Sequence, residues 1–504
     1  MLHPLDIVVI VGYLALITGF GIWLRRPNPS LQDYFLASSE LPWWAISFSI
    51  VAAETSVLTI ISTPGLAFGG DLGFLQLVFG YLVARILISL ILIPAYFRGR
   101  LLTAYQLIQR RFGSGAKSVA GLIFLVGRSL AEGVRVYAVA IVVAVILDAL
   151  PAGWNPHLGP VAILAIIAVL TLIYTFEGGL RAVVWTDFIQ ICIYVAGAVL
   201  SFVLLLRAVP GGWRGVAAVA AAHGDKLRVF HWGFSWTQPY TFWAGLLGGT
   251  FLTMATHGTD QLMVQRLLAA RNQRESTVAL LVSWVVIVFQ FTLFLLIGVA
   301  LFAFYQTHAL RLAAGTFGRY DRLYPQFVAR HLPAGVAGLV LAAVLAASMS
   351  NLSAALNALS SSTIVDFYRP FFAPGRDDRH YLRVSRLATV GWMVVMGLVA
   401  YGSRHSHSVL ESGLAIISYP FSGLLGMFLL ATLTRRATAR GAITGLVVGI
   451  GVTLGLSRAG VAYTWFVVAG TLVTFAVGYV VSWLTGRPRE LGDRQPLAAG
   501  GRPD

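Results

Sequence analysis

The chain has 504 residues, of which 58% are hydrophobic and 11% charged, and its mean hydropathy is +0.79. This composition excludes an ordinary soluble globular protein, and apolar runs of about 20 residues recur along the whole length, so we expect an all-α polytopic membrane protein. The net charge of +16 does not indicate nucleic-acid binding, because the basic residues lie mainly in loops between apolar runs. The single cysteine, Cys192, excludes a disulfide within the chain.

The apolar runs predict about 13 membrane helices. In chain order they cover residues 5–24, 43–68, 74–97, 116–149, 159–176, 183–206, 240–268, 277–304, 335–364, 384–402, 409–432, 441–457 and 463–485. The first run lacks a basic leading segment and a small-residue cleavage site, so we interpret it as a retained helix and not as a signal peptide.

The distribution of the 36 basic residues predicts the orientation of the chain. If the N-terminus is outside, most of them lie on the cytoplasmic side, such as Arg25, Arg266 and the arginines of residues 486–504. We therefore expect a multi-pass protein of the inner (plasma) membrane with its N-terminus outside and its C-terminus in the cytoplasm. The long outer loops, 207–239 and 305–334, have room for short surface helices, and the polar tail is expected to be disordered.

Two of the apolar runs are interrupted by polar and small residues. The interruptions lie at residues 52–56, 63–65, 248–250 and 256–260. The first two fall in the run that begins the first half of the chain, and the last two fall in a run that begins the second half. Interrupted helices in corresponding positions of two halves predict a transporter site near the middle of the membrane.

Residues 345–368 form a helix-length segment without Lys, Arg or Glu. Hydroxyl and amide side chains recur along it at helical spacing, at Ser350, Ser353, Asn357, Ser360 and Ser361. Unpaired polar groups cost free energy in lipid, so this stripe must face protein, water or an ion. Two interpretations stand side by side: an oxygen-lined cation site, and a tight helix seam held by serines. For a cation such as sodium, carbonyls freed at the first interruption and hydroxyls from Ser350 to Ser353 would supply the oxygens.

Glu54 lies within the first interruption, which gives it the strongest functional interpretation among the ionisable residues of the apolar runs. It could hydrogen-bond a substrate hydroxyl or amine, contribute to a cation site, or carry a proton. The structural alternative is a buried pair with His257.

The other ionisable residues in the apolar runs have clear structural alternatives. Arg128, Glu132 and Arg135 have the spacing of ion pairs on one helix, and we expect them to be structural. Arg85 is also expected to be structural, either reaching toward the membrane surface or paired with an acid on a neighbouring helix. Asp187 would either cap the start of a helix or receive a cation that leaves toward the cytoplasm.

Enzyme motifs are absent from the sequence, which has no HExxH, no Walker loop and no paired cysteine clusters. We therefore expect neither an enzyme nor an ATP-driven pump.

Several motifs, in order, make the chain resemble a bacterial member of the sodium:solute symporter family over nearly its whole length. These motifs are residues 33–37 (DYFLA), 41–44 (LPWW), 105–113 (YQLIQRRFG), 177–190 (EGGLRAVVWTDFIQ), 265–270 (QRLLAA) and the segment 345–368. The resemblance implies one transporter domain with the LeuT-like fold, in which two inverted repeats of five helices carry the site. It also implies symport of sodium with a small organic solute by alternating access.

The resemblance places the repeats and the flanking segments along the chain. The implied parts are an extra N-terminal helix at 5–24, the repeats at about 43–206 and 240–432, two C-terminal helices within 441–485, and a cytoplasmic tail at 486–504.

The resemblance also implies a sodium site. Carried over by position, it would use the backbone carbonyls of Ala52, Thr55 and Ala347 and the side chains of Ser350 and Asn351. Asn351 departs from the family, where a second hydroxyl is usual, although an amide oxygen can also bind sodium. A second sodium site or exit path would involve Asp187, Ser350 and Ser353, but Ala354 lacks the hydroxyl expected there.

The implied substrate site lies beside the two interrupted helices, at Glu54, Ser56, Leu58, Thr59, Thr253, Thr256 and His257. Leu58, Thr256 and His257 depart from the pattern of sugar-transporting members, which argues against a hexose site of the known kind. We favour a sugar or a sialic-acid-like solute, and a monocarboxylate, an amino acid or a vitamin stays open. Glu54 disfavours a bare carboxylate unless an arginine or sodium offsets its charge.

Other classes of function stay open as well. A proton could replace sodium, with Glu54 or Asp187 as its carrier, or the chain could be a sensor or channel that kept the fold without coupled transport. The expected partners are the solute, sodium and the lipid bilayer, without nucleic acid. The sequence does not indicate an oligomeric state.

Overall fold

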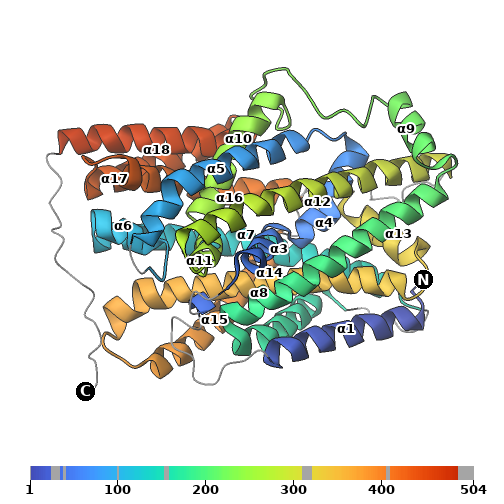
Figure 1. The fold of residues 1–504 in the computed structure, drawn as a ribbon, viewed down its shortest axis with the longest axis horizontal. Coiled ribbons are helices and arrows are strands. Elements are labelled where there is room, and N and C mark those ends of the chain that lie inside the picture. The colour runs from blue at the N-terminus through green and yellow to red at the C-terminus, as the bar shows by residue number, and fades with distance from the viewer. Residues whose placement is uncertain are drawn as a thin grey trace.

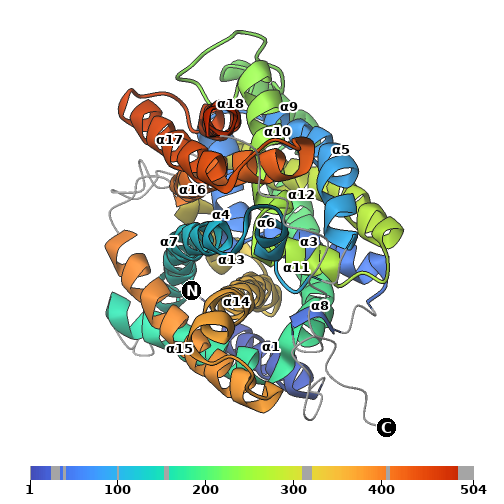
Figure 2. The ribbon, with the colours of Figure 1, turned by 90° about the vertical axis from the view of Figure 1, so that its left-hand side faces the viewer.

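The computed structural model describes residues 2–23, 35–37, 41–98, 101–151, 158–308, 320–403 and 409–485. Within these residues the structure is helical, and its only β-type contact is an isolated bridge between Leu41 and Ala270. The long helices run roughly side by side across Figure 1, and Figure 2 views many of them nearly end-on. The prediction of an all-α membrane protein is confirmed.

The helices follow one another without a soluble domain between them in the described part of the chain. The first half contains α1 (Pro4–Trp23), α3 (Trp43–Glu54), α4 (Val57–Gly69), α5 (Leu75–Phe97), α6 (Tyr105–Phe112), α7 (Ser114–Asp148), α8 (Pro160–Ala208) and α9 (Gly212–Ala222). The second half contains α10 (Phe242–Gly258), α11 (Gln261–Leu268), α12 (Gln273–Thr307), the 3₁₀ turn η2 (Tyr320–Arg322), α13 (Leu323–His331), α14 (Val336–Ser362), the π-helical η3 (Thr363–Phe372), α15 (Asp378–Gly402), α16 (Val409–Leu433), α17 (Ala439–Arg458) and α18 (Thr464–Leu484).

The described residues contain 9 helices that are long and apolar enough to cross a membrane, or 10 if the bent pair of α3 and α4 counts as one span. α1 adds a shorter apolar stretch, Pro4–Phe20. The predicted total of about 13 spans therefore stays a prediction.

Two helices are broken where polar interruptions predict a break. α3 ends at Glu54 and α4 begins at Val57, with a bend of 60° between them. α10 ends at Gly258 and α11 begins at Gln261. The interruptions at residues 52–56 and 256–260 are therefore real breaks.

The other two predicted interruptions are wrong, because α4 continues through residues 63–65 and α10 continues through residues 248–250. The glycines of α10 permit close packing instead of a break. A Cβ on Gly249 would lie 2.2 Å from the carbonyl oxygen of Leu77, and a Cβ on Gly248 would lie 2.6 Å from that of Thr464. The backbone of α10 consequently lies directly against α5 and α18.

α8 joins the two helices predicted at 159–176 and 183–206 into one element of 49 residues. A straight helix of this length would measure about 74 Å, more than twice the hydrocarbon thickness of about 30 Å. Its segment Val183–Ala208 qualifies as a membrane span. Asp187 lies inside this continuous helix, so its interpretation as the cap of a helix start is wrong.

α14 lies in the interior, with α1, α7, α8 and α15 around it in Figure 2. In the span Val336–Phe372, 94% of the most apolar window is buried inside the protein. The Asp6 carboxylate of α1 closes its N-terminal end by accepting hydrogen bonds from the backbone N–H groups of Gly335 at 2.7 Å and Gly338 at 2.8 Å. Because protein surrounds α14, its polar side chains do not face lipid.

Both long loops, 207–239 and 305–334, carry helices, as their length predicts. α9 lies in the first loop and α13 in the second, of which residues 309–319 lie outside the described part. Lys226 Nζ donates hydrogen bonds to the carbonyls of Phe68 and Gly70, both at 2.9 Å, and ties the first loop to the end of α4. Burial lowers the pKa of this amine.

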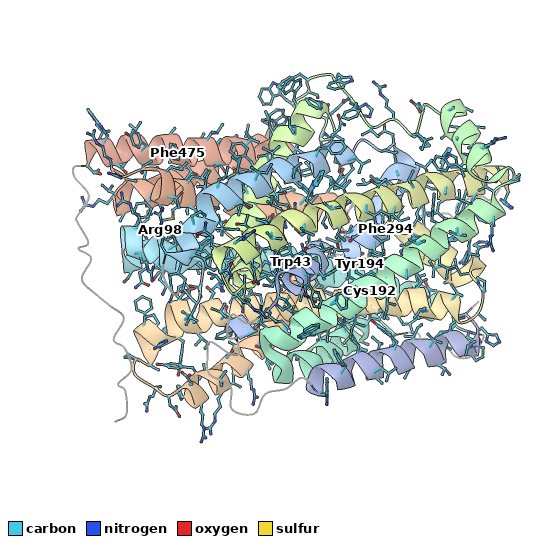
Figure 3. All side chains as sticks on the ribbon, in the orientation of Figure 1. Trp43, Arg98, Cys192, Tyr194, Phe294 and Phe475 are labelled. Carbon is cyan, nitrogen blue, oxygen red and sulfur yellow. The ribbon has the colours of Figure 1, made fainter. Side chains whose placement is uncertain are left out.

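Two further expectations concern the ends of the chain and its cysteine. Arg25 and the tail at residues 486–504, for which disorder is expected, lie outside the described residues. Cys192 is a free, exposed cysteine on α8, visible in Figure 3.

Candidate functional site

The break between α3 and α4 leaves backbone carbonyls without helical partners. Ser56 starts α4 by accepting a hydrogen bond from Leu58 N at 3.2 Å. The carbonyls of Ala52 and Thr55 accept hydrogen bonds from Asn351 Nδ2 of α14, at 3.2 Å and 3.1 Å. The unwound segment is therefore held against α14 by the Asn351 amide.

The residues predicted for the principal sodium site are only partly in contact. Ala52, Thr55 and Asn351 meet directly. Ala347 is buried one turn earlier on α14, while the hydroxyl of Ser350 donates to Asp187 Oδ1.

Asp187 is a buried junction of several helices. Its Oδ2 accepts a hydrogen bond from Ser49 Oγ of α3 at 2.5 Å and lies 3.2 Å from Arg266 Nη2 of α11. Arg266 Nε also donates to Ser49 Oγ at 2.8 Å. Arg266 is 1% exposed and is therefore buried at this junction, while its predicted place on the cytoplasmic side stays a prediction.

The polar stripe of α14 divides into two parts. Ser360 Oγ donates to Ser385 O of α15 at 2.9 Å, which agrees with the helix-seam interpretation at this end of the stripe. Ser350 faces Asp187, and Ser353 Oγ is buried without a hydrogen-bond partner among the described residues. A buried hydroxyl without a partner is costly, so Ser353 marks a position where a ligand could satisfy it.

A series of ion pairs and hydrogen bonds between side chains connects the second break to the first. Asp260 caps the first turn of α11, and its Oδ2 accepts a hydrogen bond from Arg128 Nη1 at 2.8 Å. Arg128 also pairs with Glu132, whose Oε1 lies 2.7 Å from Arg135 Nη1. Arg135 Nη1 in turn donates to Asn351 Oδ1 at 3.2 Å. The ion pairs predicted along α7 are confirmed, and they belong to a network that reaches both breaks.

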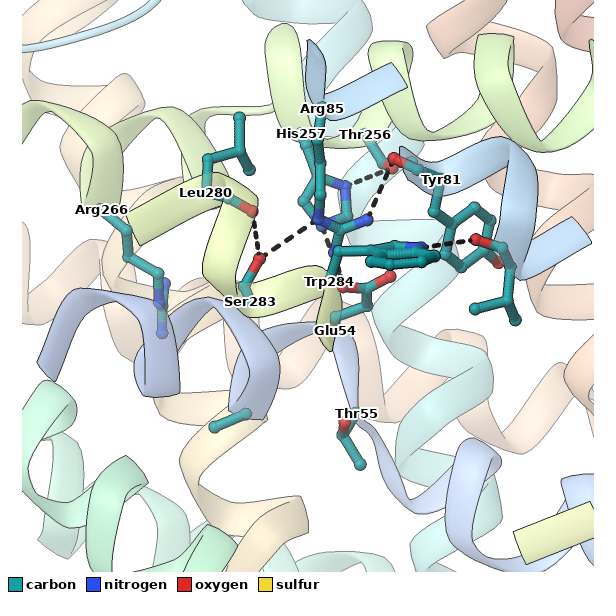
Figure 4. A network of polar contacts seen from close by, with 12 residues as sticks. Glu54, Thr55, Tyr81, Arg85, Thr256, His257, Arg266, Leu280, Ser283 and Trp284 are labelled. Atoms are coloured by element: carbon teal, nitrogen blue, oxygen red, sulfur yellow. Dashed lines mark hydrogen bonds and ion pairs between the residues drawn. The ribbon is translucent and has the colours of Figure 1, made fainter. Parts of the chain in front are cut away.

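Glu54 is paired on two sides, as Figure 4 shows. Arg85 Nη2 lies 2.5 Å from Glu54 Oε2, and His257 Nε2 lies 3.2 Å from the same oxygen. Arg85 Nε also donates to Ser283 Oγ at 3.2 Å, and His257 Nδ1 lies 3.1 Å from Thr256 Oγ1. The pair between Glu54 and His257 exists, and Arg85 is paired with an acid as expected.

The residues predicted for substrate binding line a single pocket between the two breaks. These residues are Glu54, Ser56, Thr59, Thr253, Thr256 and His257. The pocket also contains residues that sequence reasoning missed, including Phe74 just before α5, Tyr81 of α5, Arg128 and Arg135 of α7, and Leu414 of α16. The arginines were explained as ion pairs, and only the fold brings α5, α7 and α16 to the pocket.

A second pocket lies next to the first. Phe74 lines both pockets, and its ring packs against Phe291 at a centroid distance of 5.1 Å and against Tyr240 at 5.5 Å. The second pocket carries Asp71, Asp321 and Glu411. Phe74 thus lies between the candidate substrate pocket and the second, acidic pocket.

Comparison with known proteins agrees with this geometry. The model of the Sodium:solute symporter family matches residues 34–449. The sodium/sialic acid symporter NanT of Aliivibrio fischeri is 29% identical over 490 residues, which cover 95% of this chain and 93% of the relative.

Comparison with solved structures identifies the fold. A substrate-bound outward-open state of a Na+-coupled sialic acid symporter is 25% identical and superposes with a TM-score of 0.86, covering 96% of this chain and 99% of that chain. MhsT in complex with L-phenylalanine shares the fold with a TM-score of 0.53 and 15% identity, covering 88% of this chain and 98% of that chain. The expected LeuT-like architecture is confirmed. The chain belongs to the sodium:solute symporter family and is a sodium-coupled symporter of the membrane.

Proposed function

We propose that this symporter takes up an acidic, hydroxylated solute of the sialic-acid type. The observation that carries the proposal is the position of Arg135, whose side chain is 17% exposed and lines the pocket. Nη1 contacts Glu132 and Asn351, and the other N–H groups of this guanidinium have no partner among the described residues. Free donors of a guanidinium suit a carboxylate, because two parallel N–H groups match its two oxygens.

The remaining lining of the pocket is compatible with such a solute. Glu54 does not oppose an acid, since Arg85 at 2.5 Å offsets its charge. Ser56, Thr59 and Thr253 add hydroxyl groups that can donate to or accept from the hydroxyls of a sugar acid. Two of the relatives described above are sialic acid symporters by name, which also supports this substrate class.

A thermal-shift screen in sodium tests the substrate class with the full-length protein. We expect sialic acid to raise the apparent stability more than glucose, lactate or an amino acid, because a ligand that binds the folded state stabilises it. Arg135→Gln should abolish the thermal shift caused by sialic acid. Arg135→Lys keeps the positive charge but loses the two parallel N–H donors of the guanidinium, so it should weaken this shift. A shift by glucose and none by sialic acid would contradict the proposed substrate.

For sodium, we propose a principal site formed by the carbonyls of Ala52, Thr55 and Ala347 and the hydroxyl of Ser350, with the Asn351 amide lining it. Oxygens from an unwound segment and from a facing helix are what a hard cation requires. Ser350 lies beside Asp187, and the unpartnered hydroxyl of Ser353 supports a second site or exit path there. In proteoliposomes, Ser350→Ala should weaken the dependence of uptake on sodium; uptake that keeps its full sodium response would remove Ser350 from the site.

Coupling requires that solute and sodium favour one another's binding by the same factor. Sodium should therefore raise the apparent affinity for sialic acid, and sialic acid should raise the apparent affinity for sodium. Uptake without sodium, driven by a pH gradient, would favour coupling to protons through Glu54 or Asp187.

We also propose that the two repeats cover residues 43–206 and 240–432. The protein would lie in the plasma membrane, with its N-terminus outside the cell and its C-terminus in the cytoplasm. Each repeat begins with a broken helix, α3 and α4 in the first and α10 and α11 in the second, which supports the division. Reporter fusions at the C-terminus test the orientation, and a reporter active only outside the cell would reverse it.

A further inference from the structure

The amide of Asn351 lies between two of the carbonyl oxygens that the proposed sodium site uses, and the present inference rests on that proposal. Asn351 is 2% exposed, and its Nδ2 lies 3.2 Å from Ala52 O and 3.1 Å from Thr55 O. An N–H donor and a sodium ion seek the same partly negative oxygens. A nitrogen within hydrogen-bond distance of both carbonyls therefore occupies the gap that a shared cation would fill.

The partners on both sides determine which way the amide points. Nδ2 faces two acceptors, and Oδ1 accepts a hydrogen bond from Arg135 Nη1 at 3.2 Å. The flipped amide would place its oxygen against the carbonyls of Ala52 and Thr55 and its N–H groups against a guanidinium, which has no acceptor. The orientation that donates to the carbonyls is therefore the only one of the two that satisfies all partners.

We propose that the Asn351 amide and sodium compete for the carbonyl oxygens of Ala52 and Thr55. Asn351 then acts as a built-in competitor that holds α14 on the unwound segment when sodium is absent. For sodium to bind, the amide must move away from both carbonyls. The hydrogen bond from Arg135 Nη1 to Asn351 Oδ1 opposes this movement. A serine at this position would offer an oxygen and could not bridge the two carbonyls with an N–H₂ group. The asparagine therefore lowers the affinity for sodium while it stabilises the sodium-free protein.

Two substitutions separate a competitor from a ligand. Asn351→Ala removes the amide and offers no oxygen, and Asn351→Ser removes the amide and offers a hydroxyl. The full-length protein and each variant are purified, and binding of radioactive sodium is measured together with thermal stability in choline buffer and in rising sodium. The thermal measurement without sodium reports on the hydrogen bonds themselves and does not depend on transport.

We expect both variants to be less stable than the parent protein without sodium, because the hydrogen bonds to the two carbonyls are lost. Both should nevertheless bind sodium more tightly. For Asn351→Ser the half-saturating concentration should fall about tenfold, the effect of losing competing hydrogen bonds of ordinary net strength. The fall should be smaller for Asn351→Ala, which supplies no replacement oxygen.

Another asparagine offers a matched control away from both breaks. Asn272 caps α12, where its Oδ1 accepts a hydrogen bond from Glu275 N at 2.9 Å. Asn272→Ser makes the same chemical change, keeps a side chain that can cap the helix, and should leave sodium affinity unchanged.

Three results would overturn the proposal. The first is sodium binding by Asn351→Ser that is no tighter than in the parent protein. If Asn351→Ala does not fold, the result for Asn351→Ser decides the question by itself. Weaker sodium binding by Asn351→Ala would identify the amide oxygen as a ligand instead of a competitor. An equal gain in Asn272→Ser would show that the effect is not specific to the carbonyls. If the parent protein itself binds no sodium, the proposed sodium site fails before the role of Asn351 is reached.

Discussion

Arg85 of α5 and Glu54 at the end of α3 form an ion pair of 2.5 Å in which the side chains are 0% and 10% exposed. Figure 4 shows that this pair lies together with His257 and Ser283, which come from α10 and α12. The pair therefore fastens the first helix break to three neighbouring helices. Removing one member of a buried ion pair leaves the other charge uncompensated. A substitution of either residue therefore tests whether this pair stabilises the first helix break.

We expect Arg85→Met to destabilise the protein by about 3–5 kcal/mol, because the buried carboxylate of Glu54 loses its main partner. The double variant Glu54→Gln with Arg85→Met should regain part of this loss, since no buried charge remains unpaired. Unfolding of the purified protein, followed by tryptophan fluorescence, measures both. A double variant no more stable than Arg85→Met would mean that the ion pair is not what holds the break.

The Ser353 hydroxyl should matter for sodium and not for folding. It is buried without a hydrogen-bond partner among the described residues, so Ser353→Ala loses no hydrogen bond and should not lower the stability of the sodium-free protein. The rise in thermal stability caused by sodium should shrink. Ser348→Ala is the control on the same helix, because Ser348 Oγ already donates to Val344 O at 2.7 Å. An unchanged sodium response in Ser353→Ala would remove Ser353 from the proposed site.

Asp260 has two functions at the second break, and two substitutions separate them. Its side chain caps α11 and pairs with Arg128 at 2.8 Å. Asp260→Asn keeps a good cap but loses the ion pair, whereas Asp260→Ala loses both, so alanine should cost about 1 kcal/mol more. Thermal unfolding ranks the two variants. Equal stability of both variants would show that the cap contributes nothing beyond the ion pair.

Glycine at position 249 is required by the contact of α10 with α5. Gly249→Ala would place a Cβ 2.2 Å from the backbone oxygen of Leu77, so the two helices must separate. We expect a loss of several kcal/mol, or failure to accumulate in the membrane, as for other overpacked sites. Gly451→Ala on α17 is the control, because a Cβ there meets nothing within 4 Å. Fluorescence-detected size exclusion compares the amounts of folded protein, and equal yields would contradict the close contact.

Sequence by itself was sufficient for the parts of the fold that depend on local composition. Apolar runs located the helices that are long and apolar enough to cross a membrane, since a side chain's preference for lipid or protein interior over water does not require knowledge of its neighbours. Polar interruptions located the two real helix breaks, and the resemblance placed Glu54, Ser56 and His257 at what proved to be one pocket. The interruptions predicted at 63–65 and 248–250 were wrong, because glycine permits a break and proline removes one backbone hydrogen bond, but neither residue requires the helix to end. At the glycines of α10, the packing of neighbouring helices produces a close contact instead of a break.

Only the tertiary structure decided which polar groups meet. Arg266 turns inward to Asp187, and Arg135 lies within reach of both the pocket and Asn351, although these pairs come from distant parts of the chain. Local sequence shows that a buried polar residue needs a partner, but its identity depends on the packing of several helices at once. For the same reason Asn351, which the sequence marks only as an amide able to bind sodium through its oxygen, presents its nitrogen to the carbonyls of the unwound segment.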